Sequence, residues 1–169
     1  MPEKQTILRV RRDKQQGKAP STQAGEFVRE EMDHIRKGKH GARSTKQAIA
    51  IGLSKARRSG VKLAPPKKEK ASSQIRAKAQ RDLRSGQSGR RRKPSRTRSR
   101  AVSGALKREG RAAASAKSLA RQGRAAAQKR SRSSRQQAAR KAVRTKGRAR
   151  LKSSVRKAAA TRSRQRKAA

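Results

Sequence analysis

Apolar side chains recur at helical spacing in two consecutive stretches of the chain, both within residues 21–63. The first stretch places four apolar residues on one side of a helix: Phe27, Val28, Met32 and Ile35. The second, KQAIAIGLSKARR, does the same with Ala48, Ile49, Gly52, Leu53 and Ala56. Two amphipathic helices joined by the glycine-containing turn KGKHG predict a helical hairpin over residues 21–63.

The residues that flank both stretches are typical of helix ends. Hydroxyl side chains that accept a hydrogen bond from a first-turn N–H cap helices, and the candidates are Ser21 or Thr22 for the first helix and Ser44 or Thr45 for the second. Glycines end helices, and here they are Gly38 or Gly41 and then Gly60.

Gly52 lies inside the second predicted helix, where glycine costs about 1 kcal/mol relative to alanine. A glycine at such a position suggests that another backbone comes close. We therefore expect the first helix of the hairpin to approach the second at Gly52.

The remaining segments carry much weaker patterns. Residues 1–20 read as a basic N-terminal arm or a short, weak helix. Residues 64–98 read as a basic linker, in which residues 73–84 form one marginal helix with a narrow stripe of Ile75, Ala79 and Leu83. Residues 99–169 form a tail rich in Ala, Arg, Lys and Ser.

Composition argues against one large core. Hydrophobic residues make up 30% of the 169 residues, but 29 of them are Ala and 19 are Leu, Ile, Val or Phe, whereas the net charge is +44. Few large apolar residues with high net charge are typical of disorder. The fold class that we predict is therefore a mostly disordered chain with a small all-α helical hairpin near the N-terminus.

The tail predicts a polyanionic partner. Residues 110–169 hold 21 basic residues and no acidic one, and such density binds nucleic-acid phosphates without reading bases. We expect the tail to be disordered when free and to become helical on DNA in segments bounded by Gly110, Gly123 and Gly147. The residues expected to contact nucleic acid are Arg90, Arg91, Arg92, Lys93, Arg121, Arg124, Lys129, Arg130, Arg140, Lys141, Arg148, Arg150, Arg156 and Lys157.

Other functions find little support in the residues. Phe27 is the sole aromatic residue, which argues against the base stacking used by single-strand binders. His34, His40 and Glu30 are a weak metal signal, because a fourth ligand is missing and a Glu–His pair four residues apart is common on helix surfaces. We therefore predict no metal, no cofactor and no enzymatic activity.

The chain also lacks Cys, a secretory signal and a long apolar run, so we expect a protein without a membrane span, in the cytoplasm and the nucleoid.

The stretch PSTQAGEFVREEMDHIRKGKHGARSTKQAIAIGLSKARRSGVKL resembles a family of small bacterial proteins that carry a domain of unknown function. The matching positions are Gly38, Lys39, His40, Gly41, Ser44, Lys46, Gln47, Ala48, Ile49, Ala50, Leu53, Ala56 and Arg57. The resemblance covers residues 1 to about 86 and is strong over 20–63. It implies a bacterial source but no activity, and the tail is similar in composition to linker-histone tails.

The leading interpretation is a histone-like, nucleoid-associated protein that binds duplex DNA without sequence specificity, with residues 21–63 as a folded head for self-association or for positioning. Two alternatives stay open, an RNA- or ribosome-associated basic protein and an adaptor that binds a protein through the hairpin. Arg/Ser runs at 95–100, 130–135 and 161–166 are typical of RNA-binding segments, and residues 90–96 are similar to a nuclear-localisation patch.

Overall fold

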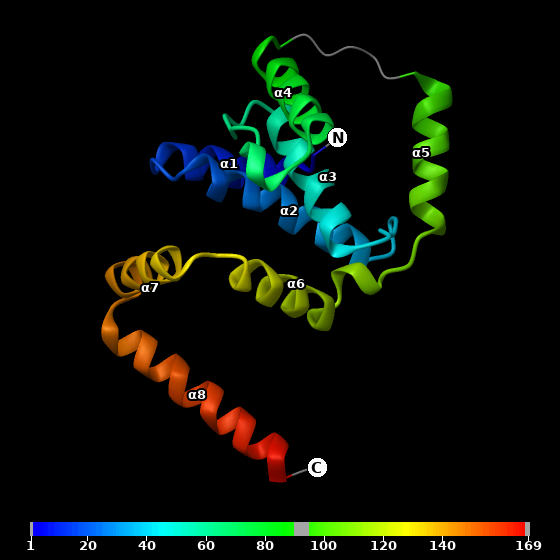
Figure 1. Cartoon of the computed structure of the whole chain (residues 1–169). Helices are drawn as coiled ribbons and strands as arrows, with labels where there is room; N and C mark the ends of the chain where they lie inside the picture. Colours follow the sequence, from blue (N-terminus) through cyan, green and yellow to red (C-terminus); the bar gives the residue numbers. More distant parts are fainter. Residues whose placement is uncertain (1, 90–94, 168–169) are drawn as a thin grey trace. The chain divides into compact units, whose positions relative to one another are not determined.

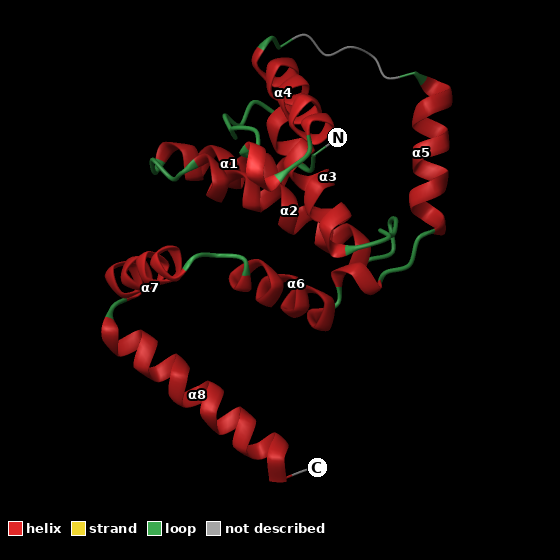
Figure 2. Cartoon of the chain, viewed as in Figure 1, coloured by secondary structure: helices red, strands yellow, loops and turns green. Residues whose placement is uncertain are grey.

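The computed structural model describes residues 2–89 and 95–167, and these are helical over most of their length (Figures 1 and 2). The α-helices of this described part are α1 (Lys4–Gln15), α2 (Pro20–Arg36), α3 (Thr45–Arg58), α4 (Ser73–Gln87), α5 (Arg96–Arg108), α6 (Ala116–Gln128), α7 (Arg132–Lys146) and α8 (Arg148–Lys167). Two 3-10 turns are η1 (Lys68–Lys70) and η2 (Ala112–Ala114). The prediction of a mostly disordered chain is therefore wrong.

The predicted hairpin is present as α2 and α3. Its apolar stripes face each other, since Phe27, Ile35, Ala48 and Ala56 are fully buried. The approach predicted at Gly52 is confirmed, because a Cβ at this position would lie 2.7 Å from the Val28 Cα. A glycine is thus required where α3 crosses α2.

Of the caps predicted for the two helices of the hairpin, one is confirmed and one is wrong. The cap of α3 is confirmed at Ser44, whose Oγ accepts from the Gln47 N–H at 3.2 Å. The cap predicted for α2 at Ser21 or Thr22 is wrong, because α2 begins at Pro20 after Ala19 and has no side-chain cap. Proline has no N–H to satisfy and its fixed φ suits the first helical position, so it begins the helix before the serine.

The N-terminal segment is part of the fold rather than an arm. Helix α1 packs against α2, and Ile7 and Val10 contact the cluster of buried residues around Phe27. A polar pair accompanies this contact, because Arg9 Nε of α1 donates to Glu26 of α2 at 2.5 Å, and Arg9 Nη2 also donates to the hydroxyl of the fully buried Thr6 at 2.9 Å.

Helix α4 attaches to α3 through small and polar groups. Ala79 is 4% exposed, Asp82 accepts from Ser54 Oγ at 2.7 Å, and a Cβ at Gly86 would collide with the carbonyl oxygen of Arg57. The marginal helix predicted at 73–84 is confirmed in position, but its predicted stripe is not buried throughout, since Ile75 is 57% exposed.

A third attachment joins residues 106–119 to the hairpin. The Gly41 N–H donates to the Leu106 carbonyl at 2.8 Å, and the Ala42 N–H donates to the Gly110 carbonyl at 3.1 Å. Ala113 and Ala114 of η2 are buried in the cluster that contains Ile35. The hairpin core thus includes residues assigned to the tail by composition.

Residue contacts divide the chain into two units, Met1–Gln122 and Gly123–Ala169. The second unit has helices but no described core, since Val143 and Val155 are 38% and 68% exposed. Ser131 caps α7 by accepting from the Ser134 N–H at 3.2 Å, and Gly147, with φ of 73°, ends it. The break predicted at Gly147 is confirmed, whereas the one at Gly123 is wrong because this residue lies inside α6.

Two physical reasons explain why the composition predicted disorder although the described chain is helical. Interfaces in the first unit are built from alanine, which was discounted as a core residue but lets helices pack closely; the buried alanines are Ala24, Ala42, Ala48, Ala56, Ala79, Ala113 and Ala114. In the second unit, Ala, Arg, Lys and Gln have high helix propensity, and serine and glycine at the helix ends satisfy backbone groups. These local terms outweigh the repulsion between like charges in the structure.

Candidate nucleic-acid interface and a buried polar cluster

Ten of the residues predicted to contact nucleic acid lie on the last three helices or in the turn after α6. Arg121 and Arg124 belong to α6, Lys129 and Arg130 follow it, and the others sit on α7 and α8. The side chains of Arg121, Arg124, Lys129, Arg130, Arg140, Lys141, Arg150, Arg156 and Lys157 are exposed, and Arg148 begins α8. Arg90, Arg91, Arg92 and Lys93 lie outside the described residues.

Basic residues of α7 and α8 do not form one narrow stripe. At 100° per residue, Arg135, Arg140 and Lys141 of α7 point in widely different directions, and Arg150 and Arg156 of α8 point about 120° apart. Residues 123–169 contain 18 basic residues and no acidic one, so no carboxylate side chain within the segment neutralises them. A cylinder with charge on every side presents cations to a polyanion in any rotation about its axis.

Helix α6 differs from α7 and α8 because it is amphipathic. Leu119 packs against the hairpin core around Ile35, whereas Lys117 and Arg121 lie four residues apart on another face. Arg124 continues that face by spacing. This helix therefore joins the folded part to the basic segment.

A basic pocket in the first unit was missed by the sequence interpretation. Lys37, His40, Lys107, Glu109 and Arg111 line an open pocket of about 360 Å³ where the KGKHG turn meets the end of α5. Three of these five side chains are permanent cations and one is an acid. Residues 37 and 111 are far apart in sequence, so no local pattern indicated that their charges meet.

The acids of the first unit are largely used within the fold. Arg9 Nε donates to Glu26 at 2.5 Å, Lys18 Nζ to Asp13 at 2.6 Å, and Arg58 Nε to Asp82 at 2.9 Å. The first pair ties α1 to α2 and the third ties α3 to α4, whereas Lys18 lies in the turn after α1. The three pairs also neutralise part of the basic charge of this unit, whereas residues 123–169 contain no acidic side chain.

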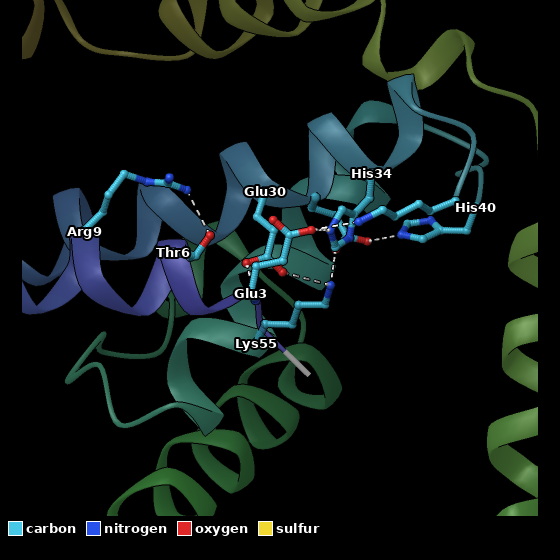
Figure 3. A network of polar contacts seen from close by, with 9 residues as sticks. Glu3, Thr6, Arg9, Glu30, His34, His40 and Lys55 are labelled. Atoms are coloured by element: carbon cyan, nitrogen blue, oxygen red, sulfur yellow. Dashed lines mark hydrogen bonds and ion pairs between the residues drawn. The ribbon is translucent and has the colours of Figure 1, made fainter.

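A second polar cluster lies where the start of α1, the C-terminal half of α2 and α3 meet (Figure 3). Glu30 and Glu31 are 3% and 1% exposed. Lys55 Nζ from α3 donates to Glu31 Oε2 at 2.5 Å and lies 3.9 Å from Glu30 Oε1. One ammonium group thus lies beside two buried carboxylates, and one oxygen of each carboxylate accepts no hydrogen bond.

Glu3 connects the N-terminus of the chain to this cluster. Its backbone N–H donates to Glu30 Oε2 at 3.1 Å, and its carboxylate contacts both Lys39 Nζ and His34 Nε2 at 2.8 Å. The hydrogen bonds from Lys39 and His34 lower the pKa of Glu3 to about 2. The Glu3 carboxylate is therefore ionised at neutral pH.

The two histidines meet, although they come from different elements. His34 on α2 and His40 in the following turn have ring centroids 6.0 Å apart in an edge-to-face arrangement. The Glu30–His34 surface pair expected from spacing is wrong, because Glu30 is buried and His34 bonds Glu3. It is Glu31 that faces the rings, with its Oε1 3.2 Å from His40 Nε2.

Comparison with known proteins finds that part of the first unit is similar to a protein family. Residues 19–68 match a family of unknown function, DUF6496, which agrees with the resemblance inferred from the STKQAIAIGLSKAR segment. The match covers α2, α3 and the residues up to η1, and it carries no activity with it. No curated protein and no solved structure matches the chain. Within the described part of the chain, every helix is too short or too polar to cross a membrane.

Proposed function

We propose that this protein binds nucleic acid through phosphate contacts made by residues 123–169, with duplex DNA as the preferred partner. The observation that carries the proposal is the segment of 18 basic residues without an acid, in which the basic side chains that the structure describes are exposed. Its histone-like character, bacterial source and place in the nucleoid belong to the same proposal. They rest on composition and on the family resemblance.

The helical form of the segment supports binding to a duplex groove or along its backbone. Helix α8 has 20 residues, which corresponds to about 30 Å of helix. If 18 basic residues each neutralised one phosphate, they would cover about 30 Å of duplex axis at one charge per about 1.7 Å. Arginine favours such contacts because its planar guanidinium binds phosphate oxygens in pairs.

The position of Phe27 favours a duplex over a stacked single strand. This sole aromatic side chain is fully buried between α2 and α3 and is not available to stack on a base. Phosphate contacts by themselves do not distinguish DNA from RNA, so an RNA duplex is the competing partner.

Salt dependence of binding tests the proposal with two charge-matched variants of the full chain. One replaces Arg124, Lys129 and Arg130 with Gln, and the control replaces the exposed residues Arg29, Arg43 and Lys46 with Gln. Each variant loses three positive charges. Binding to a labelled DNA duplex is followed by fluorescence anisotropy at several salt concentrations.

We expect log affinity to fall linearly with log salt and to tolerate changes in DNA sequence. The tail variant should reduce the slope by up to about 2.7, at about 0.9 per lost phosphate contact, and the control should reduce it less. An affinity that salt barely changes, or equal slopes for the wild type and the tail variant, would contradict the proposal. Tighter binding to duplex RNA in the same assay would favour the RNA-associated alternative.

A further inference from the structure

We propose that Glu31, His34 and His40 form a binding site for a divalent transition-metal ion of the Zn²⁺ type. One nitrogen of each imidazole and one carboxylate oxygen of Glu31 lie within 4.8 Å of one another. Imidazole nitrogen with carboxylate oxygen is a donor set typical of Zn²⁺, which sits about 2.0–2.2 Å from each. A tetrahedral ion needs its donors about 3.4 Å apart, so small side-chain rotations complete the site.

The hydrogen bond of His40 leaves a lone pair directed at Glu31. Its Nδ1 lies 3.0 Å from the Gly41 carbonyl oxygen, and a carbonyl only accepts, so Nδ1 carries the proton. In the neutral ring, Nε2 is then an acceptor, and it faces Glu31 Oε1 at 3.2 Å. Two acceptors at this distance repel each other unless a cation or a proton lies between them.

A hydrogen bond at one ring nitrogen likewise leaves a lone pair on the other nitrogen of His34. The ionised Glu3 carboxylate accepts from His34 Nε2, which leaves Nδ1 of the neutral ring with the lone pair. Histidines that bind metals almost always donate their other ring N–H to a carboxylate or a backbone carbonyl. Both acceptors are present here, Glu3 for His34 and Gly41 for His40.

Burial and charge also favour a cation. The Glu31 side chain is 1% exposed, and its Oε1 accepts no hydrogen bond although its Oε2 is satisfied by Lys55. The carboxylates of Glu3, Glu30 and Glu31 face the ammonium groups of Lys39 and Lys55, which leaves one negative charge when both imidazoles are neutral. A divalent ion compensates this charge and satisfies Glu31 Oε1.

Titration of the metal-free full chain with Zn²⁺ tests the site, with histidine NMR as the first readout. His34 and His40 are the only histidines of the chain, so H34A assigns both ring signals. We expect both signals to shift in the wild type and to saturate at one equivalent of Zn²⁺. Unmoved ring signals at saturating Zn²⁺ would overturn the proposal.

Affinity in the variants provides the second readout. H34A, H40A and E31Q should each weaken Zn²⁺ binding at least about 10-fold in competition with a chromophoric chelator. The matched control is E26Q, which removes a carboxylate that pairs with Arg9 away from the cluster, and it should not change the affinity. Ca²⁺ and Mg²⁺ should not compete, because they prefer all-oxygen sites. Equal Zn²⁺ affinity in the wild type and the H34A/H40A double variant would also overturn the proposal.

Discussion

Gly52 of α3 lies directly against the backbone of Val28 of α2: an added Cβ would be 2.7 Å from the Val28 Cα and 3.0 Å from its nitrogen. Backbone atoms cannot move aside as a flexible side-chain end can. The two helices therefore cross at a point where a hydrogen atom fits and a methyl group does not.

Replacing Gly52 with Ala should destabilise the first unit. Overpacking costs about 1–3 kcal/mol and outweighs the gain in helix propensity of about 1 kcal/mol. The matched control is G25A in α2, where an added Cβ meets nothing within 4 Å, and this variant should gain up to about 1 kcal/mol. Urea unfolding followed by circular dichroism measures both. A G52A variant as stable as G25A would show that the helices do not approach here.

Ser44 should contribute to stability as a cap, whereas Ser21 should not. The Ser44 Oγ accepts from the Gln47 N–H, and the Gln47 Oε1 accepts from the Arg43 N–H at 2.9 Å, so S44A removes one of two hydrogen bonds at this helix start. We expect S44A to lower the free energy of unfolding by about 1 kcal/mol. S21A should be neutral, because α2 has no side-chain cap. Thermal unfolding compares the two variants. A larger loss of stability in S21A than in S44A would show that Ser21 caps α2.

Thr45 should hold the segment after α5 on the hairpin. Its hydroxyl donates to the Ala113 carbonyl at 2.7 Å, in a buried hydrogen bond. T45V keeps the shape of the side chain but leaves that carbonyl unsatisfied, which costs about 1–3 kcal/mol. Amide hydrogen exchange in residues 112–119 should accelerate in T45V.

The control for this experiment is T22V, at an exposed threonine of α2. Limited proteolysis of the wild type should leave a fragment that extends to about residue 122, the end of the first unit. A protected fragment that ends near residue 63, with exchange in 112–119 equally fast in wild type and T45V, would contradict the docking.

The contribution of Glu3 to stability should depend on pH in the acid range. Its pKa is lowered from 4.5 to about 2 by hydrogen bonds from Lys39 and His34. Because the folded-state pKa lies below the unfolded one, the stabilisation is complete above about pH 4.5 and disappears as the pH falls to about 2. E3Q should thus be less stable than the wild type at about pH 6, and the difference should vanish at about pH 2.

Urea midpoints measured with a chelator present test this dependence without bound metal. The control is E69Q, which removes an exposed acid of η1 and should have a smaller effect. A difference between E3Q and the wild type that stays constant from about pH 6 to pH 2 would contradict the pairing of Glu3.

The sequence by itself determined the local features of this protein. The stripes of α2 and α3, the Ser44 cap and the glycine at position 52 follow from periodicity and helix-end chemistry, which act over about four residues. The positive charge of residues 123–169 is likewise a property of composition. The prediction of disorder from composition was wrong, however, because interfaces made by alanine and helices of high propensity do not require many large apolar residues.

The tertiary structure decided which distant groups meet. Thr45 donates a hydrogen bond to a carbonyl 68 residues away, and Glu3 contacts His34 across 31 residues. Neither contact could therefore be predicted from local spacing in the sequence. The contact between Glu31 and His40 is of the same kind: helical spacing brings both Glu30 and Glu31 near His34, but only the turn after α2 returns His40 to the Glu31 carboxylate. Spacing predicts which residues share a helix face, whereas packing between helices selects the carboxylate that is buried beside the imidazoles.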